Sequence, residues 1–132
     1  MYLLDTNVCI HILNRSHAGV ARQFRLHAPR TLTLCSVVKA ELLFGARRSS
    51  RVEENLRLLE VFFAPFQSLS FDDRCAEEAA LIRAQLAAQG RPIGPHDILI
   101  AATARVHDAV LVTHNTGEFA RVTGLRLEDW ET

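Results

Sequence analysis

The sequence of 132 residues has no net charge, because its fifteen basic and fifteen acidic residues cancel. A long-range field that would collect nucleic acid over the whole surface is therefore excluded, and a polyanion would have to be held by a local patch. Lysine is almost missing as well. Lys39 is the only one, and the other basic residues are arginines, whose planar guanidinium suits phosphate and carboxylate partners.

Long apolar runs are also absent. No stretch approaches the roughly 18 residues that a membrane span requires, and the acidic N-terminal region lacks the basic start of a signal peptide. The three cysteines, Cys9, Cys35 and Cys75, are widely spaced and lie among apolar neighbours. This pattern is typical of reduced core residues rather than of a disulfide framework or a zinc site. We therefore expect a cytoplasmic protein that does not enter a membrane.

The remaining composition is that of one folded domain. Single domains cluster at about 100 to 150 residues, and a hydrophobic content of 48% is enough for a core. Short apolar strands alternate with amphipathic helices along residues 1–132, which predicts a single α/β domain with a mostly parallel sheet and helices on both faces. The strands are expected at residues 1–4, 31–35, 66–71, 109–113 and 125–127, and the helices at residues 8–13, 17–28, 37–46, 50–63, 72–90, 98–107 and 115–120.

The N-terminal stretch contains the first candidate site. Three apolar residues run into Asp5, Thr6 and Asn7 and then into an apolar-spaced helix, so Asp5 stands at the carboxyl end of a buried strand. Ligands of open parallel sheets bind outside those ends. An Asp at this position can equally cap the helix that follows, and the residues alone do not choose between the two roles.

Three further acids or amides lie at strand-to-helix junctions or in early helical turns. Glu41 belongs to the first half of a predicted helix with apolar neighbours, although most such glutamates are only solvated. Asp97 begins a helix, where a capping role is the more frequent one. The turn from Asn115 to Glu118 fits a capping box as well as it fits a site.

The predicted topology brings the acids Asp5, Glu41 and Asp97 to one edge of the sheet. Two carboxylates about 4 Å apart repel by about 4 kcal/mol at an effective dielectric constant near 20, so three together need a counter-charge. Mg²⁺ or Mn²⁺, bound by oxygen ligands, is the natural counter-charge. Such an ion can activate a water for in-line attack on a phosphoryl group.

Histidine offers a competing chemistry, because two histidines can act as acid and base in a metal-free ribonuclease. Most of the six histidines fall on predicted helix surfaces or helix ends. Only His96 and His114 fall near the presumed site, where they are candidate substrate contacts.

Four segments of the sequence resemble the signature segments of PIN domains, in the same order and at the family's spacing. They are residues 4–7 (LDTN), 40–46 (AELLFGA), 94–102 (GPHDILIAA) and 111–115 (LVTHN). The ending at residues 124–130 (GLRLEDW) is similar to that of VapC toxins from bacterial VapBC toxin-antitoxin pairs. The resemblance implies a Rossmann-like fold, a homodimer, and a small VapB antitoxin that covers the active site and links the complex to operator DNA.

The resemblance also implies an endoribonuclease that depends on Mg²⁺ or Mn²⁺, with Asp5, Glu41 and Asp97 as its metal cluster. Water would attack the phosphorus and leave 5′-phosphate and 3′-hydroxyl ends. The branch it most resembles usually cleaves the anticodon stem-loop of initiator tRNA, which inhibits translation. The family often has another Asp about where this chain has Asn115, so Glu118 or Asn115 is a candidate ligand through a water.

Other polar residues are expected around this cluster. Thr6 and Asn7 would present a hydroxyl and an amide beside the metal, while Thr113 and Asn115 would hold waters or a phosphate. Arginines that flank the site-bearing segments are candidate substrate contacts: Arg47, Arg48, Arg51 and Arg91. The predicted helices also carry spare apolar bulk for an amphipathic antitoxin segment, at Ile10, Leu13, Leu43, Phe44, Phe62 and Phe63.

Two alternatives remain open on the sequence. The first keeps the fold without the chemistry, so that the acids are helix caps and the protein is an interaction module. The second is an aspartyl phosphatase or phosphoacceptor, which also places an Asp after the first strand. Phosphatases of that type need a second Asp where this chain has Asn7, and receiver-like domains need a lysine that residues 113–115 lack.

Overall fold

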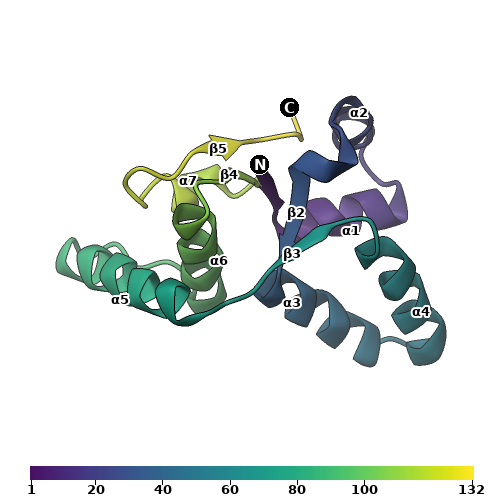
Figure 1. The fold of residues 1–132 in the computed structure, drawn as a ribbon, viewed down its shortest axis with the longest axis horizontal. Helices are drawn as coiled ribbons and strands as arrows, with labels where there is room; N and C mark the ends of the chain where they lie inside the picture. The colour runs from purple at the N-terminus through teal and green to yellow at the C-terminus, as the bar shows by residue number, and fades with distance from the viewer.

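A five-stranded parallel sheet forms the centre of the computed structural model, which describes all 132 residues (Figure 1). The strand order is β3-β2-β1-β4-β5, and every neighbouring pair is parallel. The predicted α/β fold with a mostly parallel sheet is confirmed. The strands are β1 (Tyr2–Leu4), β2 (Leu32–Cys35), β3 (Gln67–Leu69), β4 (Val110–Val112) and β5 (Leu127–Glu128).

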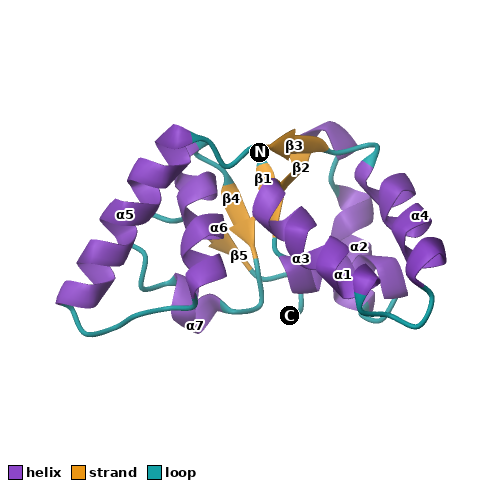
Figure 2. Cartoon of the chain, turned by 90° about the horizontal axis from the view of Figure 1, so that it is seen from below, coloured by secondary structure: helices purple, strands orange, loops and turns teal.

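Seven α-helices surround the sheet. They are α1 (Thr6–Asn14), α2 (Ala18–Leu26), α3 (Ser36–Arg47), α4 (Val52–Phe63), α5 (Asp73–Ala88), α6 (Pro95–Val106) and α7 (Thr116–Phe119), and a 3-10 turn (Pro29–Thr31) precedes β2. Figure 1 and Figure 2 show α5 and α6 together on one side of the sheet and α1 to α4 on the other. None of these helices combines the length and the apolar character that a membrane crossing demands.

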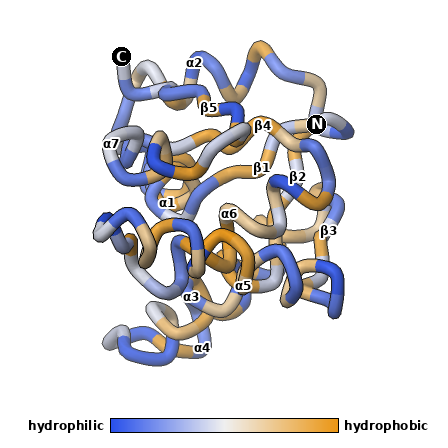
Figure 3. The backbone as a smooth tube through the Cα atoms, turned by 90° about the vertical axis from the view of Figure 1, so that its left-hand side faces the viewer, coloured by the Kyte–Doolittle hydropathy of each residue, from blue (hydrophilic) through white to orange (hydrophobic).

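Strand β1 lies in the middle of the sheet, between β2 and β4. Leu3 and Leu4 are 0% exposed, because successive side chains of a strand point to opposite faces and helices cover both. Thr33 is also fully buried, and its hydroxyl donates to the carbonyl of Tyr2 at 2.8 Å, so its polar group is satisfied. Figure 3 shows hydrophobic stretches along β1 and β4 inside hydrophilic outer turns.

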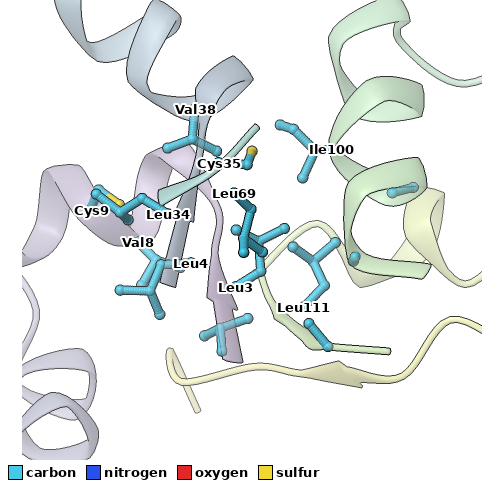
Figure 4. Packing of buried hydrophobic residues seen from close by; sticks show 14 of the residues in the cluster. Leu3, Leu4, Val8, Cys9, Leu34, Cys35, Val38, Leu69, Ile100 and Leu111 are labelled. Carbon is cyan, nitrogen blue, oxygen red and sulfur yellow. The ribbon is translucent and has the colours of Figure 1, made fainter. Parts of the chain in front are cut away.

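The core continues from the strands into the helices on both sides. Figure 4 shows Ile100 of α6 on one side of the strand residues and Val8 and Cys9 of α1 on the other. All three side chains are at most 1% exposed. Cys9, Cys35 and Cys75 are buried and unpaired, as the sequence predicted.

The chain reverses its direction of travel across the sheet at β1. It passes from β1 outward to β2 and β3 and then returns to the opposite side of β1 for β4 and β5. Ligands of open parallel sheets bind at such a switch point, outside the carboxyl ends of the strands. The ends of β1 and β4 are therefore the place where this fold offers a site.

Candidate active site

Asp5 follows the last residue of β1 and lies at the switch point. Its backbone amide continues the sheet by donating to the carbonyl of Val112 at 3.0 Å. One carboxylate oxygen accepts from the amide of Thr6 at 2.8 Å, and the other accepts from the hydroxyl of Thr113 at 2.7 Å. Asp5 thus caps α1 and also faces β4, so both roles considered for it have a structural basis.

Glu41 reaches the same edge from the second turn of α3. Its carboxylate accepts from the Thr6 hydroxyl at 2.6 Å and lies 3.0 Å from Nδ1 of His96. The Glu41 side chain is 28% exposed, compared with 67% for His96. Glu41 is therefore held between the start of α1 and the start of α6 and is not an ordinary solvated helix residue.

Asp97 lies in the first turn of α6. The helix begins at Pro95, two residues before Asp97, with Gly94 as its N-cap. A proline is favourable at that first position because the missing amide has no partner inside the helix anyway. The prediction that Asp97 itself begins this helix as its cap is wrong, and its carboxylate is left free to face the neighbouring acids.

Asn115 connects two of these acids. Its side-chain amide donates to Glu118 at 2.8 Å and lies 3.5 Å from Asp97. Asn115 is the N-cap of α7, but its side chain makes no capping bond, so a capping box in this turn is not formed. Its backbone amide donates to the hydroxyl of Thr113 at 3.0 Å. The turn after β4 thereby ties Asp5, Asp97 and Glu118 into one polar network.

The electrostatics show that these acids repel one another. Burial raises the pKa of Asp97 to about 6, and the charges of Asp5, Glu118 and Glu41 act in the same direction. Burial also raises the pKa of Asp5; the hydrogen bonds from Thr113 and Thr6 lower it, and the charge of Glu41 raises it. The charges of neighbouring acids thus add to burial in raising the pKa values of Asp97 and Asp5, as expected for acids that share a site.

The donor set fits a hard divalent cation, although the protein alone does not form a closed ligand cage. No group of three or more His, Cys, Asp or Glu side chains is arranged as a ready-made metal site. The oxygens of Asp5 and Glu41 are instead engaged by threonine hydroxyls. The cluster offers carboxylate oxygens and no thiolate, which suits Mg²⁺ or Mn²⁺. Its mutual repulsion is the strain that a cation would relieve.

A cavity of about 380 Å³ opens beside Asp5. Its lining comes from the start of α1, from the turn after β4 and from the end of the chain: Asp5, Asn7, Ile10, His11, His114, Asn115 and Glu131. The ring of His114 lies 3.0 Å from Asp129, and this hydrogen bond, together with the charges of Glu131 and Asp129, raises the pKa of His114. Asn7, His114 and Asn115 were predicted near the site and lie there.

Two residues of the cavity wall were missed by the sequence reasoning. His11 was counted among the histidines on predicted helix surfaces and given no role; it lines the cavity, with its ring nitrogen 3.4 Å from Glu131. Glu131 received no role at all. The available signal was the expected last strand: if it pairs parallel to β4, the residues after it must emerge at the same edge as Asp5.

The candidate arginines divide into two groups. Arg91 is exposed in the loop between α5 and α6, just before the segment that carries His96 and Asp97. Arg47, Arg48 and Arg51 lie at or beyond the end of α3, and by helix geometry even Arg47 is about 9 Å along the axis from Glu41.

The contacts of that second group are local. The guanidinium of Arg48 lies 5.6 Å from the ring centroid of Phe44, and Arg51 pairs with Glu54 at 3.4 Å. None of the three arginines lines the cavity beside Asp5. Arg91 does not line that cavity either; it stays a candidate because it is exposed and forms no ion pair with an acidic side chain.

The arrangement defines a class of protein: an α/β domain with clustered carboxylates at the switch point of a parallel sheet, suited to metal-assisted phosphoryl chemistry. A family model described as the PIN domain matches residues 2–125. The chain is 43% identical over 129 residues to the tRNA(fMet)-specific endonuclease VapC of Shigella flexneri, with 98% of this chain and 97% of that protein covered. It is 34% identical over 132 residues to ribonuclease VapC2 of Rickettsia felis, with 99% and 98% covered.

Solved structures agree with these relatives. The chain matches the crystal structure of VapBC2 from Rickettsia felis bound to a promoter DNA fragment with a TM-score of 0.90 and 34% identity, over 98% of both chains. It matches the DNA-bound VapBC of Salmonella typhimurium with a TM-score of 0.90 and 37% identity, over 98% of this chain and 97% of that one. The chain therefore belongs to the PIN domain family, in its branch of VapC ribonucleases. This membership argues against the aspartyl phosphatase alternative.

Proposed function

We propose that this chain is the toxin of a type II toxin-antitoxin pair and acts as a metal-dependent endoribonuclease. The observation that carries the proposal is the convergence of Asp5, Glu41 and Asp97 on one sheet edge, where burial and the charges of Asp5 and Glu41 raise the pKa of Asp97. The ribonuclease names of its relatives support the same conclusion. The proposed reaction is hydrolysis of a phosphodiester bond by water, leaving a 5′-phosphate and a 3′-hydroxyl.

The roles of the residues follow from their contacts. Asp5 and Asp97 would hold Mg²⁺ or Mn²⁺, and Glu41 would hold the ion or orient the attacking water. The bound ion would supply a polarised water and neutralise charge on the phosphoryl group. Thr113 fixes one oxygen of Asp5, and Thr6 fixes one oxygen of Glu41. These hydroxyls pre-orient the acids, as second partners commonly do for metal-binding carboxylates.

The region around Asp97 contributes in a different way. Asn115 holds Glu118 at 2.8 Å, so Glu118 or Asn115 can serve as a ligand through a water. His96 pairs with Glu41 and is 67% exposed, which leaves its ring within reach of an RNA strand. Arg91 is our candidate for a phosphate contact at the rim.

The proposed substrate is a structured RNA with an accessible loop. Loops present unstacked bases and phosphates that a cleft can take in, whereas a regular duplex does not. Two relatives are named tRNA(fMet)-specific endonucleases, at 43% and 37% identity. The anticodon stem-loop of initiator tRNA is therefore the first substrate to test, and its cleavage in the cytoplasm would stop translation.

The proposed partner is a VapB antitoxin. A largely apolar groove of about 580 Å³ lies between α1, α3 and α4, with Leu13, Leu58, Val61 and Phe62 in its wall. Glu41 lines the end of this groove, so an amphipathic segment bound there would reach the catalytic acids. The structural relatives are VapBC complexes, some with DNA. We propose that this chain, as a homodimer, contacts operator DNA only through its antitoxin.

The test is cleavage of in vitro transcribed initiator tRNA by the purified chain with Mg²⁺, followed by mapping of both new ends. Wild type should cut one loop and leave 5′-phosphate ends, and excess EDTA should stop the reaction. Cleavage that persists in EDTA, or cyclic phosphate products, would refute the mechanism. If wild type cuts no RNA while its Asp5→Ala variant still arrests growth, the interaction-module alternative is correct.

A further inference from the structure

The end of the chain forms one wall of the cavity beside Asp5. Strand β5 pairs parallel to β4, with Glu128 opposite Val112, so residues 129–132 emerge where β4 delivers Thr113 and His114. We call these four residues the C-terminal tail. Glu131 of this tail lines the same cavity as Asp5 and Asn7. Nothing in the proposed catalytic mechanism uses this tail.

The tail is held firmly in place. Trp130 is only 3% exposed, its ring stacks on His27 with centroids 4.9 Å apart, and its indole nitrogen donates to Glu128 at 3.1 Å. The amide of Glu131 donates to Asp129 at 2.9 Å. Such an anchored segment is suited to shaping a binding site, because little order is lost when a ligand arrives.

Two histidines join the tail to the rest of the cavity wall. Nε2 of His11 lies 3.4 Å from a carboxylate oxygen of Glu131, and Nδ1 of His114 lies 3.0 Å from Asp129. The Glu131 side chain is 14% exposed. Its second carboxylate oxygen makes no hydrogen bond within the protein, and neither does the side chain of Asn7. The cavity therefore offers a free acceptor and a free amide.

The size and chemistry of the cavity fit one nucleotide. Its volume of about 380 Å³ lies near the lower end of the range of roughly 300 to 1,000 Å³ for small-molecule sites. Ile10 is the only hydrophobic residue of its lining. Unpaired RNA bases are recognised by stacking on rings, including histidine, and by hydrogen bonds to their edges. His11 and His114 supply rings, and Asn7 and Glu131 supply edge contacts.

We propose that this cavity binds the unpaired nucleotide next to the scissile phosphate, and that Glu131 selects a base with an exocyclic amino group. The inference rests on the proposed ribonuclease function. An ionised carboxylate only accepts hydrogen bonds. Adenine, cytosine and guanine each offer an exocyclic amino group to it, whereas uracil offers only its ring N3–H, which lies between two carbonyl oxygens that repel a carboxylate. Glu131 is thus a base-selecting residue, and its role differs from that of Asp5, Glu41 and Asp97, which are proposed to hold the metal ion at the phosphate.

The first test compares four stem-loop RNAs that differ only in the nucleotide beside the cleaved bond. We expect wild type to cleave the uridine version about tenfold or more slowly, the discrimination given by about 1 to 3 kcal/mol per good base contact. Glu131→Gln should bring the four rates together, because a glutamine amide both donates and accepts. Glu77→Gln, an exposed acid of α5, is the matched control and should keep the wild-type pattern.

The single tryptophan checks that the tail stays in place. Trp130 should keep its fluorescence spectrum in Glu131→Gln, because the substitution does not touch its stacking on His27. If all four rates fall equally in Glu131→Gln with an unchanged spectrum, or if the pattern does not move, the base-selecting role is refuted.

The second test does not depend on cleavage. The four nucleosides carry no phosphate, so they can be tested without a cation, and the ring signals of His11 and His114 can be followed by NMR. Adenosine, cytidine and guanosine should shift both rings in wild type, and uridine should shift them least. The absence of any shift would refute the nucleotide cavity. Shifts without RNA cleavage by wild type would refute the ribonuclease function and leave the cavity standing.

Discussion

The cavity beside Asp5 and the groove between α1, α3 and α4 adjoin each other but differ in chemistry. The cavity of about 380 Å³ has a single hydrophobic residue in its wall, and the groove of about 580 Å³ has nine hydrophobic residues among fourteen. Ile10 lines both. The polar surface carries carboxylates that repel one another and is suited to the proposed catalysis, while the apolar surface is suited to a partner. Their contiguity means that an occupant of the groove lies next to the acids.

The largest expected effect separates catalysis from antitoxin binding. Asp5→Asn should lower the rate of RNA cleavage by about 10² to 10³, the order lost when one electrostatic group of an active site is removed. Binding of antitoxin to the groove should not change, because Asp5 does not line it. Single-turnover cleavage and a binding isotherm measure the two quantities on the same preparations.

The matched control is Asp108→Asn. Asp108 is an exposed acid in the turn before β4, at the opposite edge of the sheet, with a φ of 53° that asparagine also tolerates. The Asp108→Asn variant should cleave RNA at the wild-type rate. A comparable loss in both variants would mean that net charge, rather than the site, governs activity.

The next effect concerns the groove. Val61 is 75% exposed and lines its wall. Val61→Asp should weaken antitoxin binding by about 2 kcal/mol, roughly 30-fold, the size typical of a central interface residue. RNA cleavage by the free toxin should be unaltered. Isothermal titration with the cognate VapB antitoxin gives the affinity.

Leu81→Asp provides the comparison for that measurement. Leu81 is 47% exposed on α5, on the other side of the sheet, and lines neither the groove nor the cavity. The affinity of the Leu81→Asp variant for antitoxin should equal that of wild type. Equal losses in both variants would show that the antitoxin does not occupy the groove.

A smaller effect is the pH dependence of stability in EDTA. The pKa of Asp97 is raised from 3.8 to about 6 in the folded chain, so between these values the folded state keeps a proton that the unfolded state releases. The free energy of unfolding should therefore fall as the pH rises from about 4 to about 6, by about 1 kcal/mol after allowance for the partial exposure of Asp97.

Urea unfolding at several pH values measures this slope. Asp97→Asn should flatten it and be more stable than wild type above pH 6, while losing RNA cleavage. The pKa of Asp5 is raised as well, so in Asp97→Asn the slope of the unfolding free energy against pH should become smaller but not zero. A steeper slope in Asp97→Asn would contradict the assigned repulsion.

The smallest effect tests the arginines. Arg91→Ala should raise KM for RNA by up to about fivefold, the range of about 0 to 1 kcal/mol found for exposed charge pairs, and the difference should shrink at high salt. Arg51→Ala should leave KM unchanged, because Arg51 is occupied with Glu54 away from the cavity. If Arg51→Ala has the larger effect, the RNA path runs along α3 and α4 instead.

Asp5 was predictable from the sequence for a local reason, since a strand that turns directly into a helix presents its last residue at the sheet edge. Glu41 and Asp97 needed the parallel topology, and the family resemblance supplied their joint role. The start of α6 was misjudged by three residues because a proline can open a helix as well as end one.

His11 and Glu131 lay beyond the reach of pattern reasoning. Periodicity predicts that a strand forms, but it does not say beside which strand, or in which direction, that strand pairs. The position of Glu131 depends on the parallel pairing of β5 with β4. The spacing of the four signature segments likewise does not indicate which histidines line the cavity beside Asp5.

The central position of β1 has a consequence for the stage of synthesis at which the acid cluster can form. Asp5 receives its hydrogen bond from Thr113, a residue 108 positions later, and its amide bonds to Val112 of β4. Parallel pairing of this kind waits for the late strand, because distant contacts form only after the chain between them is available. A nascent chain that has not yet exposed β4 therefore has no assembled acid cluster.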